Sequence, residues 1–260
     1  LPSSAEDDTP FQQNSDGTLW PVNDEGYYSG LTDVDTAMTH SLNTVAVKVL
    51  AQLGLENSYD FLTEKFGIST LVKDYETSTG VTRSDLNYAP LALGGLTKGV
   101  TTLEMAAAYA AFANSGVYNE PKTYVKVLAN DNSTVVLEKE TEQRVAMKET
   151  TAYLMTDMLR RAVNESGGTG GGARFSGMHI AGKTGTTDNY DRYFTGYTPY
   201  YCAAVWVGYK NNERISYSVN PAASLWRQVM EKVHADLPDK SFNRPSSGLT
   251  TVSVCADSGM

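Results

Sequence analysis

Cysteine and histidine are scarce in this chain of 260 residues, which contains two Cys and three His. The two cysteines, Cys202 and Cys255, provide no disulfide framework, and no Cys-x-x-Cys motif occurs. The three histidines, His40, His179 and His234, are too widely spaced for a zinc site. We therefore expect neither a metal ion nor another cofactor.

Basic residues are outnumbered, and long apolar runs are missing. The chain has 21 Lys and Arg against 30 Asp and Glu, a net charge of −9, which argues against a nucleic-acid partner. No apolar run approaches the ~18 residues that a membrane span needs. The sequence opens with Leu1 and shows no signal-peptide pattern, so we expect a portion of a longer, processed protein.

Residues 179–186 read His-Ile-Ala-Gly-Lys-Thr-Gly-Thr and predict one short strand after a Gly-rich run. Glycine inside a strand often marks the close approach of a ligand or another backbone, and we assign that role to Gly185. Lys183 provides a positive charge, and the hydroxyls of Thr184 and Thr186 can donate to a carboxylate. The pattern predicts an edge strand that binds an extended peptide. The alternative is a solvent-facing hairpin strand, because short motifs often occur by chance.

The rest of the chain predicts helices around a mainly antiparallel sheet. Expected helices cover 32–39, 43–53, 58–66, 101–113 and 150–164, and a last one starts at 221. Expected strands cover 123–128, 134–139, 200–207, 215–218 and 250–254, and residues 1–30 and 79–100 are expected to be loops. The expected apolar faces are Ala46, Val49, Leu50 and Leu53 on one helix, and Leu225, Trp226, Val229 and Val233 on the last helix.

The fold class is α/β in the broad sense, with helices and strands segregated as in α+β proteins. We expect one domain over residues 1–240. Residues 241–260 turn polar and are expected to begin a C-terminal linker or extension.

Two motifs occur in the order used by class A β-lactamases and penicillin-binding proteins. Ser41-Leu42-Asn43 lies at the junction of the first two predicted helices, and Lys-Thr-Gly-Thr follows at 183–186. Over roughly residues 20–235 the chain resembles the transpeptidase domain of class A penicillin-binding proteins. The stretches that carry the resemblance are 41–48, 99–109, 112–114, 182–187, 194–199 and 205–208.

The resemblance implies acyl transfer from peptides that end in D-Ala-D-Ala, and binding of β-lactams. It implies that Ser41 relays a proton to the leaving amine, and that Asn43 holds the substrate amide and orients the catalytic lysine. Lys183 would supply positive potential, Thr184 and Thr186 would bind the terminal carboxylate, and the Thr186 N–H would serve the oxyanion hole. The partners implied are peptidoglycan stem peptides, a glycosyltransferase domain and a membrane anchor, on the extracytoplasmic face of the bacterial membrane.

The sequence departs from the family in two places. The family usually has Asp-x-Trp-Phe after the Lys-Thr-Gly strand, whereas residues 191–194 are Asp-Arg-Tyr-Phe, and we expect Arg192 at the rim of the site. No serine has a lysine three residues later, and Ser224 and Ser241 have arginine, which cannot act as a base at neutral pH. We expect the Ser-x-x-Lys helix to lie outside these 260 residues and the chain to be inactive alone.

Other functions stay open at this point. They are a D,D-carboxypeptidase or β-lactamase-like serine hydrolase, and a non-catalytic binding module with the penicillin-binding fold. A His40–Ser41 dyad is disfavoured because adjacent helical residues diverge by about 100°. For a transpeptidase we expect the Ser41 hydroxyl and the Lys183 amine within about 8 Å. A missing nucleophile helix should also expose apolar faces of the 43–53 and 101–113 helices.

Overall fold

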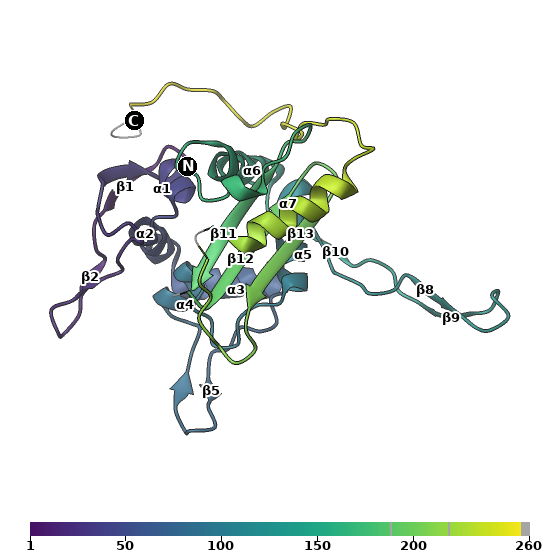
Figure 1. Cartoon of the computed structure of the whole chain (residues 1–260), viewed down its shortest axis with the longest axis horizontal. Helices are drawn as coiled ribbons and strands as arrows, with labels where there is room; N and C mark the ends of the chain where they lie inside the picture. Colours follow the sequence, from purple (N-terminus) through teal and green to yellow (C-terminus); the bar gives the residue numbers. More distant parts are fainter. Residues whose placement is uncertain (188, 218, 256–260) are drawn as a thin grey trace.

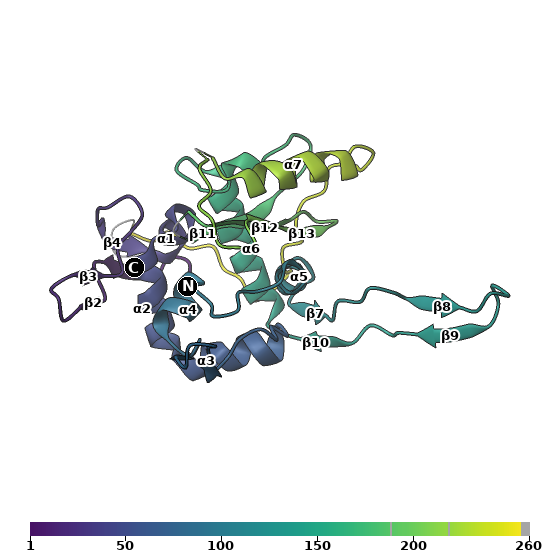
Figure 2. The same ribbon diagram turned by 60° about the horizontal axis from the view of Figure 1, so that its bottom comes forward.

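A three-stranded antiparallel sheet forms the centre of the chain in a computed structural model that describes residues 1–187, 189–217 and 219–255. The strand order is β11 (Ala181–Thr187), β12 (Asp191–Tyr197), β13 (Cys202–Gly208). Helices α5 (Thr102–Ala113) and α6 (Glu149–Asn164) cover one face, and α7 (Pro221–Val233) covers the other (Figures 1 and 2). The predicted combination of helices and antiparallel sheet is confirmed.

Strand β12 is buried on both faces, since helices lie above and below the sheet. Phe194 is fully buried, and its ring packs edge-on against Trp226 of α7 at 5.2 Å between centroids. Gly182 on β11 makes room for this ring, because a Cβ there would lie 2.7 Å from Phe194 Cζ. One of the two glycines in the Lys-Thr-Gly strand therefore serves internal packing.

The other helices are short, apart from α2. They are α1 (Val34–His40), α2 (Asn43–Leu53), α3 (Leu55–Asp60), the π-helical turn η1 (Phe61–Lys65), α4 (Tyr88–Leu93) and the 3-10 turn η2 (Gly171–Ala173). The bounds of α2 match the prediction. Helix α4 lies within the predicted loop over 79–100, and α3 starts three residues before its predicted position.

The predicted apolar faces of α2 and α7 were largely wrong. In α2 the buried residues are Thr44, Val45, Val47 and Leu50, while Val49 and Leu53 are exposed. In α7 they are Ala222, Ala223, Trp226 and Met230, while Leu225, Val229 and Val233 are exposed. The small side chains of Ala222 and Ala223 allow α7 to approach the sheet closely. The face of α7 that packs on the sheet is therefore set by side-chain size as well as by hydrophobicity.

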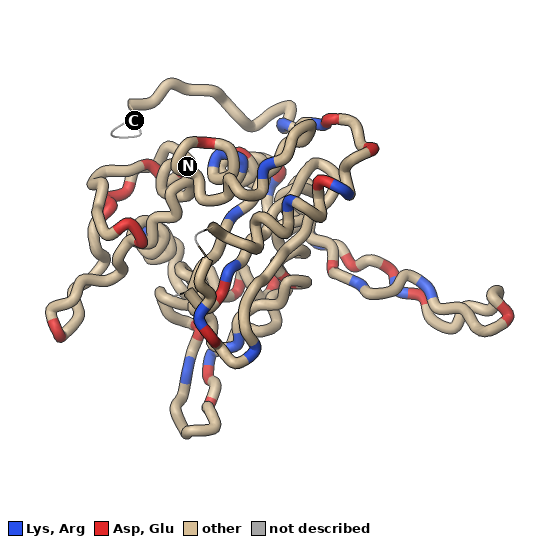
Figure 3. Tube along the Cα trace, viewed as in Figure 1, with Lys and Arg blue, Asp and Glu red and all other residues tan. Residues whose placement is uncertain are grey.

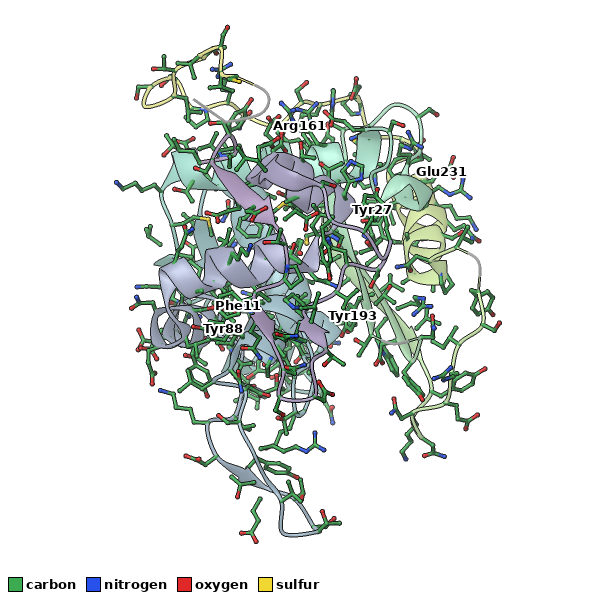
Figure 4. The ribbon with its side chains drawn as sticks, turned by 90° about the vertical axis from the view of Figure 1, so that its left-hand side faces the viewer. Phe11, Tyr27, Tyr88, Arg161, Tyr193 and Glu231 are labelled. Atoms are coloured by element: carbon green, nitrogen blue, oxygen red, sulfur yellow. The ribbon has the colours of Figure 1, made fainter. Side chains whose placement is uncertain are left out.

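The N-terminal 30 residues are more ordered than the predicted loop. Strand β1 (Ala5–Asp8) pairs antiparallel with β4 (Gly30–Asp33), and β2 (Gln12–Gln13) pairs with β3 (Leu19–Trp20). The ring of Phe11 lies 5.0 Å from that of Tyr88, so this segment packs on α4 (Figure 4). The strands are short, and Gln12–Gln13 has no apolar alternation, which explains why the sequence pattern missed them.

The remaining strands form two-stranded ribbons. They are β5 (Tyr75–Glu76) with β6 (Thr82–Arg83), β7 (Val117–Asn119) with β10 (Gln143–Val145), and β8 (Lys126–Leu128) with β9 (Val135–Glu138). The β8–β9 ribbon corresponds to the strands predicted over 123–128 and 134–139, and it projects away from the rest of the molecule (Figures 1 and 2). Two of the predicted strands are not observed. Residues 250–254 form no strand, and residues 215–217 form none either. Ser218, the last residue of the strand predicted over 215–218, lies outside the described residues.

Within the described ranges, no helix is long and apolar enough to cross a membrane. No group of three or more His, Cys, Asp or Glu in the same ranges could hold a metal ion.

Candidate active site

Ser41 and Lys183 are in direct contact. The amine of Lys183 donates to Ser41 Oγ at 2.9 Å, although 142 residues separate the two positions. The predicted proximity is confirmed. Ser41 caps the C-terminus of α1 in the left-handed conformation, with φ of 60°, which is uncommon for a residue with a Cβ. Such backbone strain is typical of functional positions.

The environment of Lys183 makes its charged form less stable than it is in water. Burial lowers the pKa of the Lys183 amine to about 8, and the opposing charge of Asp24 only partly offsets this effect. The same amine donates to the Thr184 carbonyl at 3.2 Å and approaches Thr169 Oγ1 at 3.5 Å. A lysine with a pKa near neutrality can both attract an anion and exchange a proton.

Thr169, from the Gly-rich run at 167–172, is a site residue that the sequence reasoning missed. Its Oγ1 accepts a hydrogen bond from Thr184 Oγ1 at 2.7 Å and lies within reach of Lys183. This run packs closely on α1, since a Cβ at Gly167 would lie 2.4 Å from His40 Cε1. The only signal in the sequence is a hydroxyl within a Gly-rich loop just before the Lys-Thr-Gly strand.

Gly185 and Thr186 line the site together with Tyr193 of the neighbouring strand. A Cβ at Gly185 would lie 3.2 Å from Tyr193 Cβ, so the position is already tight before any ligand approaches. The Tyr193 hydroxyl donates to the Val100 carbonyl at 2.7 Å, which ties β12 to the loop before α5. Tyr193 takes the place where the family usually has Trp.

Arg192 does not lie at the rim of the site, and that prediction was wrong. Its side chain is 7% exposed and donates to Asn189 Oδ1 at 2.6 Å and to the Asp191 carbonyl at 3.1 Å. Because side chains alternate along a strand, residue 192 faces away from the side that Asp191 and Tyr193 share.

Asn43 is held at the start of α2. Its side-chain amide donates to the Val22 carbonyl at 2.9 Å, and its backbone N–H donates to Asn23 Oδ1 at 3.0 Å. The structure thus joins Ser41, Lys183, Thr184 and Thr169 through hydrogen bonds and places Asn43 two residues beyond Ser41.

A groove of about 910 Å³ opens beside Lys183. Its walls are mostly apolar, and the large side chains include Phe66, Met105, Tyr109, Phe112 and Leu159. The α5 face that we expected to be exposed lines this groove. Helix α2 contributes nothing to the lining, although its Val49 and Leu53 are exposed elsewhere.

The comparison with known proteins agrees with this geometry. The family model for the penicillin binding protein transpeptidase domain matches residues 2–231, and the chain belongs to this family. The chain is 40% identical over 233 residues to penicillin-binding protein 1A of Clostridium acetobutylicum, covering 89% of this chain and 27% of that protein. It therefore spans only about a quarter of that relative's length.

Solved structures share the fold. Penicillin-binding protein 1A from Haemophilus influenzae superposes with a TM-score of 0.78 at 20% identity, covering 100% of this chain and 43% of the other. The D,D-transpeptidase domain of a peptidoglycan glycosyltransferase from Eggerthella lenta gives 0.67 at 20% identity, covering 90% of this chain and 60% of the other.

Proposed function

We propose that this chain is the larger, C-terminal part of a peptidoglycan D,D-transpeptidase domain. Such a domain cross-links stem peptides by acyl transfer from D-Ala-D-Ala and binds β-lactams at the same site. The observation that carries the proposal is the 2.9 Å contact between Ser41 and Lys183. It joins the two motifs beside the hydroxyls of Thr169 and Thr184, within a chain that belongs to the transpeptidase family.

In this proposal Ser41, Asn43 and Lys183 serve the transfer step. A nucleophilic oxygen attacks the carbonyl of the penultimate D-Ala, and the terminal D-Ala leaves as an amine once it has received a proton. Ser41 relays that proton, supported by Lys183, whose pKa near 8 suits exchange at neutral pH. Asn43 holds the substrate amide and orients the lysine of the nucleophile motif.

Strand β11 binds the donor peptide. It is one of the two edge strands of the central sheet in the described part of the chain, so an extended peptide can add to it. The terminal carboxylate meets Lys183 and the hydroxyls of Thr184 and Thr186. Before the peptide binds, Thr184 donates its single hydroxyl proton to Thr169 Oγ1, and on binding the Thr184 hydroxyl turns that proton to the carboxylate. The Thr186 N–H serves the oxyanion hole, and Gly185 permits close approach.

The nucleophile belongs, in this proposal, to a Ser-x-x-Lys helix encoded upstream of residue 1. No serine of the 260 residues has that spacing, and the apolar groove beside Lys183 offers a surface on which an apolar helix can pack. The parent protein also carries a glycosyltransferase domain and a membrane anchor and works on the extracytoplasmic face. This fits a chain that covers 27% of its clostridial relative.

Labelling with a fluorescent penicillin, followed by a denaturing gel, tests the proposal. We expect no labelled band for the 260-residue chain and a strong band for the full-length protein. In the full-length protein, Ser41→Ala should slow labelling at least tenfold without preventing folding. A band from the 260-residue chain that disappears with Ser41→Ala would make Ser41 the nucleophile and contradict the proposed roles.

Product analysis separates the transpeptidase from the alternatives. A full-length transpeptidase gives cross-linked peptide dimers when an acceptor amine is supplied. Release of D-Ala without dimers would indicate a carboxypeptidase, and rapid turnover of the β-lactam would indicate a hydrolase. A full-length protein that binds penicillin without a covalent adduct would be a binding module.

A further inference from the structure

Helix α2 is capped by a side chain from outside the helix. Leu42 precedes the helix and makes no capping hydrogen bond through its side chain. Instead, Asn23 Oδ1 accepts hydrogen bonds from the N–H of Asn43 at 3.0 Å and of Thr44 at 3.4 Å. The first N–H groups of a helix have no partner within it, so Asn23 satisfies two of them from a distant loop.

A fully buried carboxylate holds Asn23 in place. Asp8 is 0% exposed, and its Oδ1 accepts from Asn23 Nδ2 at 2.7 Å and also from the Thr44 hydroxyl. Its Oδ2 accepts from the Ser29 N–H at 2.7 Å. Lys48 of α2 donates to the Asp7 carbonyl at 2.5 Å, so two points on α2 are fixed to the end of β1.

Asp8 is ionised at neutral pH. Burial by itself raises the pKa of this carboxyl, but the hydrogen bonds from Thr44, Asn23 and Ser29 and the charge of Lys48 outweigh it, and the pKa lies below its usual value. A negative charge next to the N-terminus of α2 is also favourable with respect to the helix dipole. A buried, fully bonded carboxylate at this place fixes geometry more than it adds stability.

The same loop also holds the side chain of Asn43. Its amide donates to the Val22 carbonyl at 2.9 Å, one residue before Asn23. Both the backbone N–H and the side chain of Asn43 are therefore bound to residues 22–23. A shift of α2 by one residue would turn Asn43 by about 100° and displace it by about 1.5 Å.

We infer that Asp8 and Asn23 are positioning residues for Asn43, because they fix where α2 begins and hold Asn43 relative to Ser41 and Lys183. The inference rests on the proposed function, in which Asn43 binds the substrate. Neither Asp8 nor Asn23 belongs to the Ser-x-Asn or Lys-Thr-Gly motif, and they act through Asn43 rather than by touching substrate.

A double-mutant cycle in the full-length protein tests this role. We expect Asn23→Ala to slow acylation by a β-lactam about tenfold or more in the wild-type background. In an Asn43→Ala background the same substitution should change the rate less than twofold, because no Asn43 side chain is left to misplace. Asp8→Asn should behave in the same way as Asn23→Ala.

Asn220→Ala is the matched control. Asn220 Oδ1 also accepts two backbone N–H groups, at the start of α7, and its Nδ2 donates to a backbone carbonyl. Its removal should lower the melting temperature to a similar extent while acylation stays within about threefold of wild type.

The possible results separate the inference from the proposed function. If Asn23→Ala slows acylation equally in both backgrounds, its role is general stability and the inference is wrong. If Asn43→Ala leaves acylation unchanged, the role proposed for Asn43 fails, and the inference fails with it. If Asn23→Ala does not fold, Thr44→Val removes a single bond to Asp8 and enters the same cycle, with Thr44→Ser as the variant expected to restore the rate.

Discussion

At the scale of single residues, the site contains a serine with an uncommon backbone conformation and a lysine with a lowered pKa. Ser41 adopts a left-handed backbone that glycine would adopt more easily, and this turn carries its hydroxyl to Lys183. Lys183 in turn is buried enough for its pKa to fall to about 8. A free serine or lysine on a helix surface would have neither property, so these two residues are specialised by their surroundings.

The pKa of Lys183 predicts how ligand binding depends on pH. Below about pH 8 the amine is charged and attracts a carboxylate, and above that value it loses its proton. The affinity for a peptide ending in D-Ala-D-Ala should fall about tenfold between about pH 7 and pH 9.5, which corresponds to ~1.4 kcal/mol. Calorimetric titration of the full-length protein measures this. Lys183→Arg stays charged throughout and should not show the decline; a parallel decline in both proteins would exclude Lys183 as the cause.

At the scale of elements, an ion pair joins the helix that ends at Ser41 to the rest of the domain. Asp35 of α1 contacts Arg161 of α6 at 2.9 Å, and its side chain is only 15% exposed. Burial raises the pKa of Asp35 to about 6, and the charge of Arg161 lowers it again only in part. The nearby charges of Asp33, Glu165 and Asp157 also raise this pKa. The charged form of the carboxylate that connects α1 to α6 is therefore destabilised.

This raised pKa predicts a pH-dependent contribution to stability. A carboxyl with a folded-state pKa above its unfolded value binds a proton more tightly in the folded state, so its contribution to stability grows as pH falls from about 7 to about 4. Asp35→Asn cannot titrate and should lack this gain. The measurement is the difference in melting temperature between pH 7 and pH 5 for both proteins. Asp60→Asn, at a side chain that is 56% exposed, is the control and should follow the wild type.

At the scale of the whole molecule, charge and apolar surface are unevenly distributed. Residues 1–60 contain ten Asp and Glu and a single Lys, so they carry the entire net charge of −9 (Figure 3). The apolar groove lies beside Lys183 and is lined by α5, α6 and the loops around α4. The groove measures about 910 Å³, which lies at the upper end of the range of about 300–1,000 Å³ for ligand pockets, and its walls are mostly apolar.

The groove should bind an environment-sensitive apolar dye. We expect the 260-residue chain to enhance the fluorescence of anilinonaphthalene sulfonate at least several-fold more than the full-length protein, in which our proposal has the upstream helix fill the groove. Met105 of α5 lines the groove, so Met105→Glu should reduce the signal. Leu103 lies on the same helix and is 53% exposed, and Leu103→Glu is the matched control that should change little. Equal fluorescence for the chain and the full-length protein would argue against an upstream helix in this groove.

The sequence by itself determined the local features of this protein. Helix α2 begins and ends where its pattern predicts, and α5 begins within one residue of its predicted start, where Thr101 and Glu104 form a capping box. The sequence also predicted the Lys-Thr-Gly strand, the strands of the β8–β9 ribbon and the two motifs. Each of these depends on residues that are close together in the chain. The resemblance in motif order predicted the family correctly.

Only the tertiary structure decided which distant residues meet. Thr169 joins the site because the Gly-rich run packs on α1, and Arg192 leaves it because strand register turns its side chain away. The buried faces of α2 and α7 include Thr44, Ala222 and Ala223, while the larger apolar side chains of Val49, Leu53 and Leu225 are exposed, which the apolar pattern alone did not predict. Asp8 and Asn23 belong to a segment that the sequence predicts as loop, and their hydrogen bonds to each other and to α2 join positions 15 to 36 residues apart. Local propensity acts over a few residues, whereas these contacts depend on packing across the whole chain.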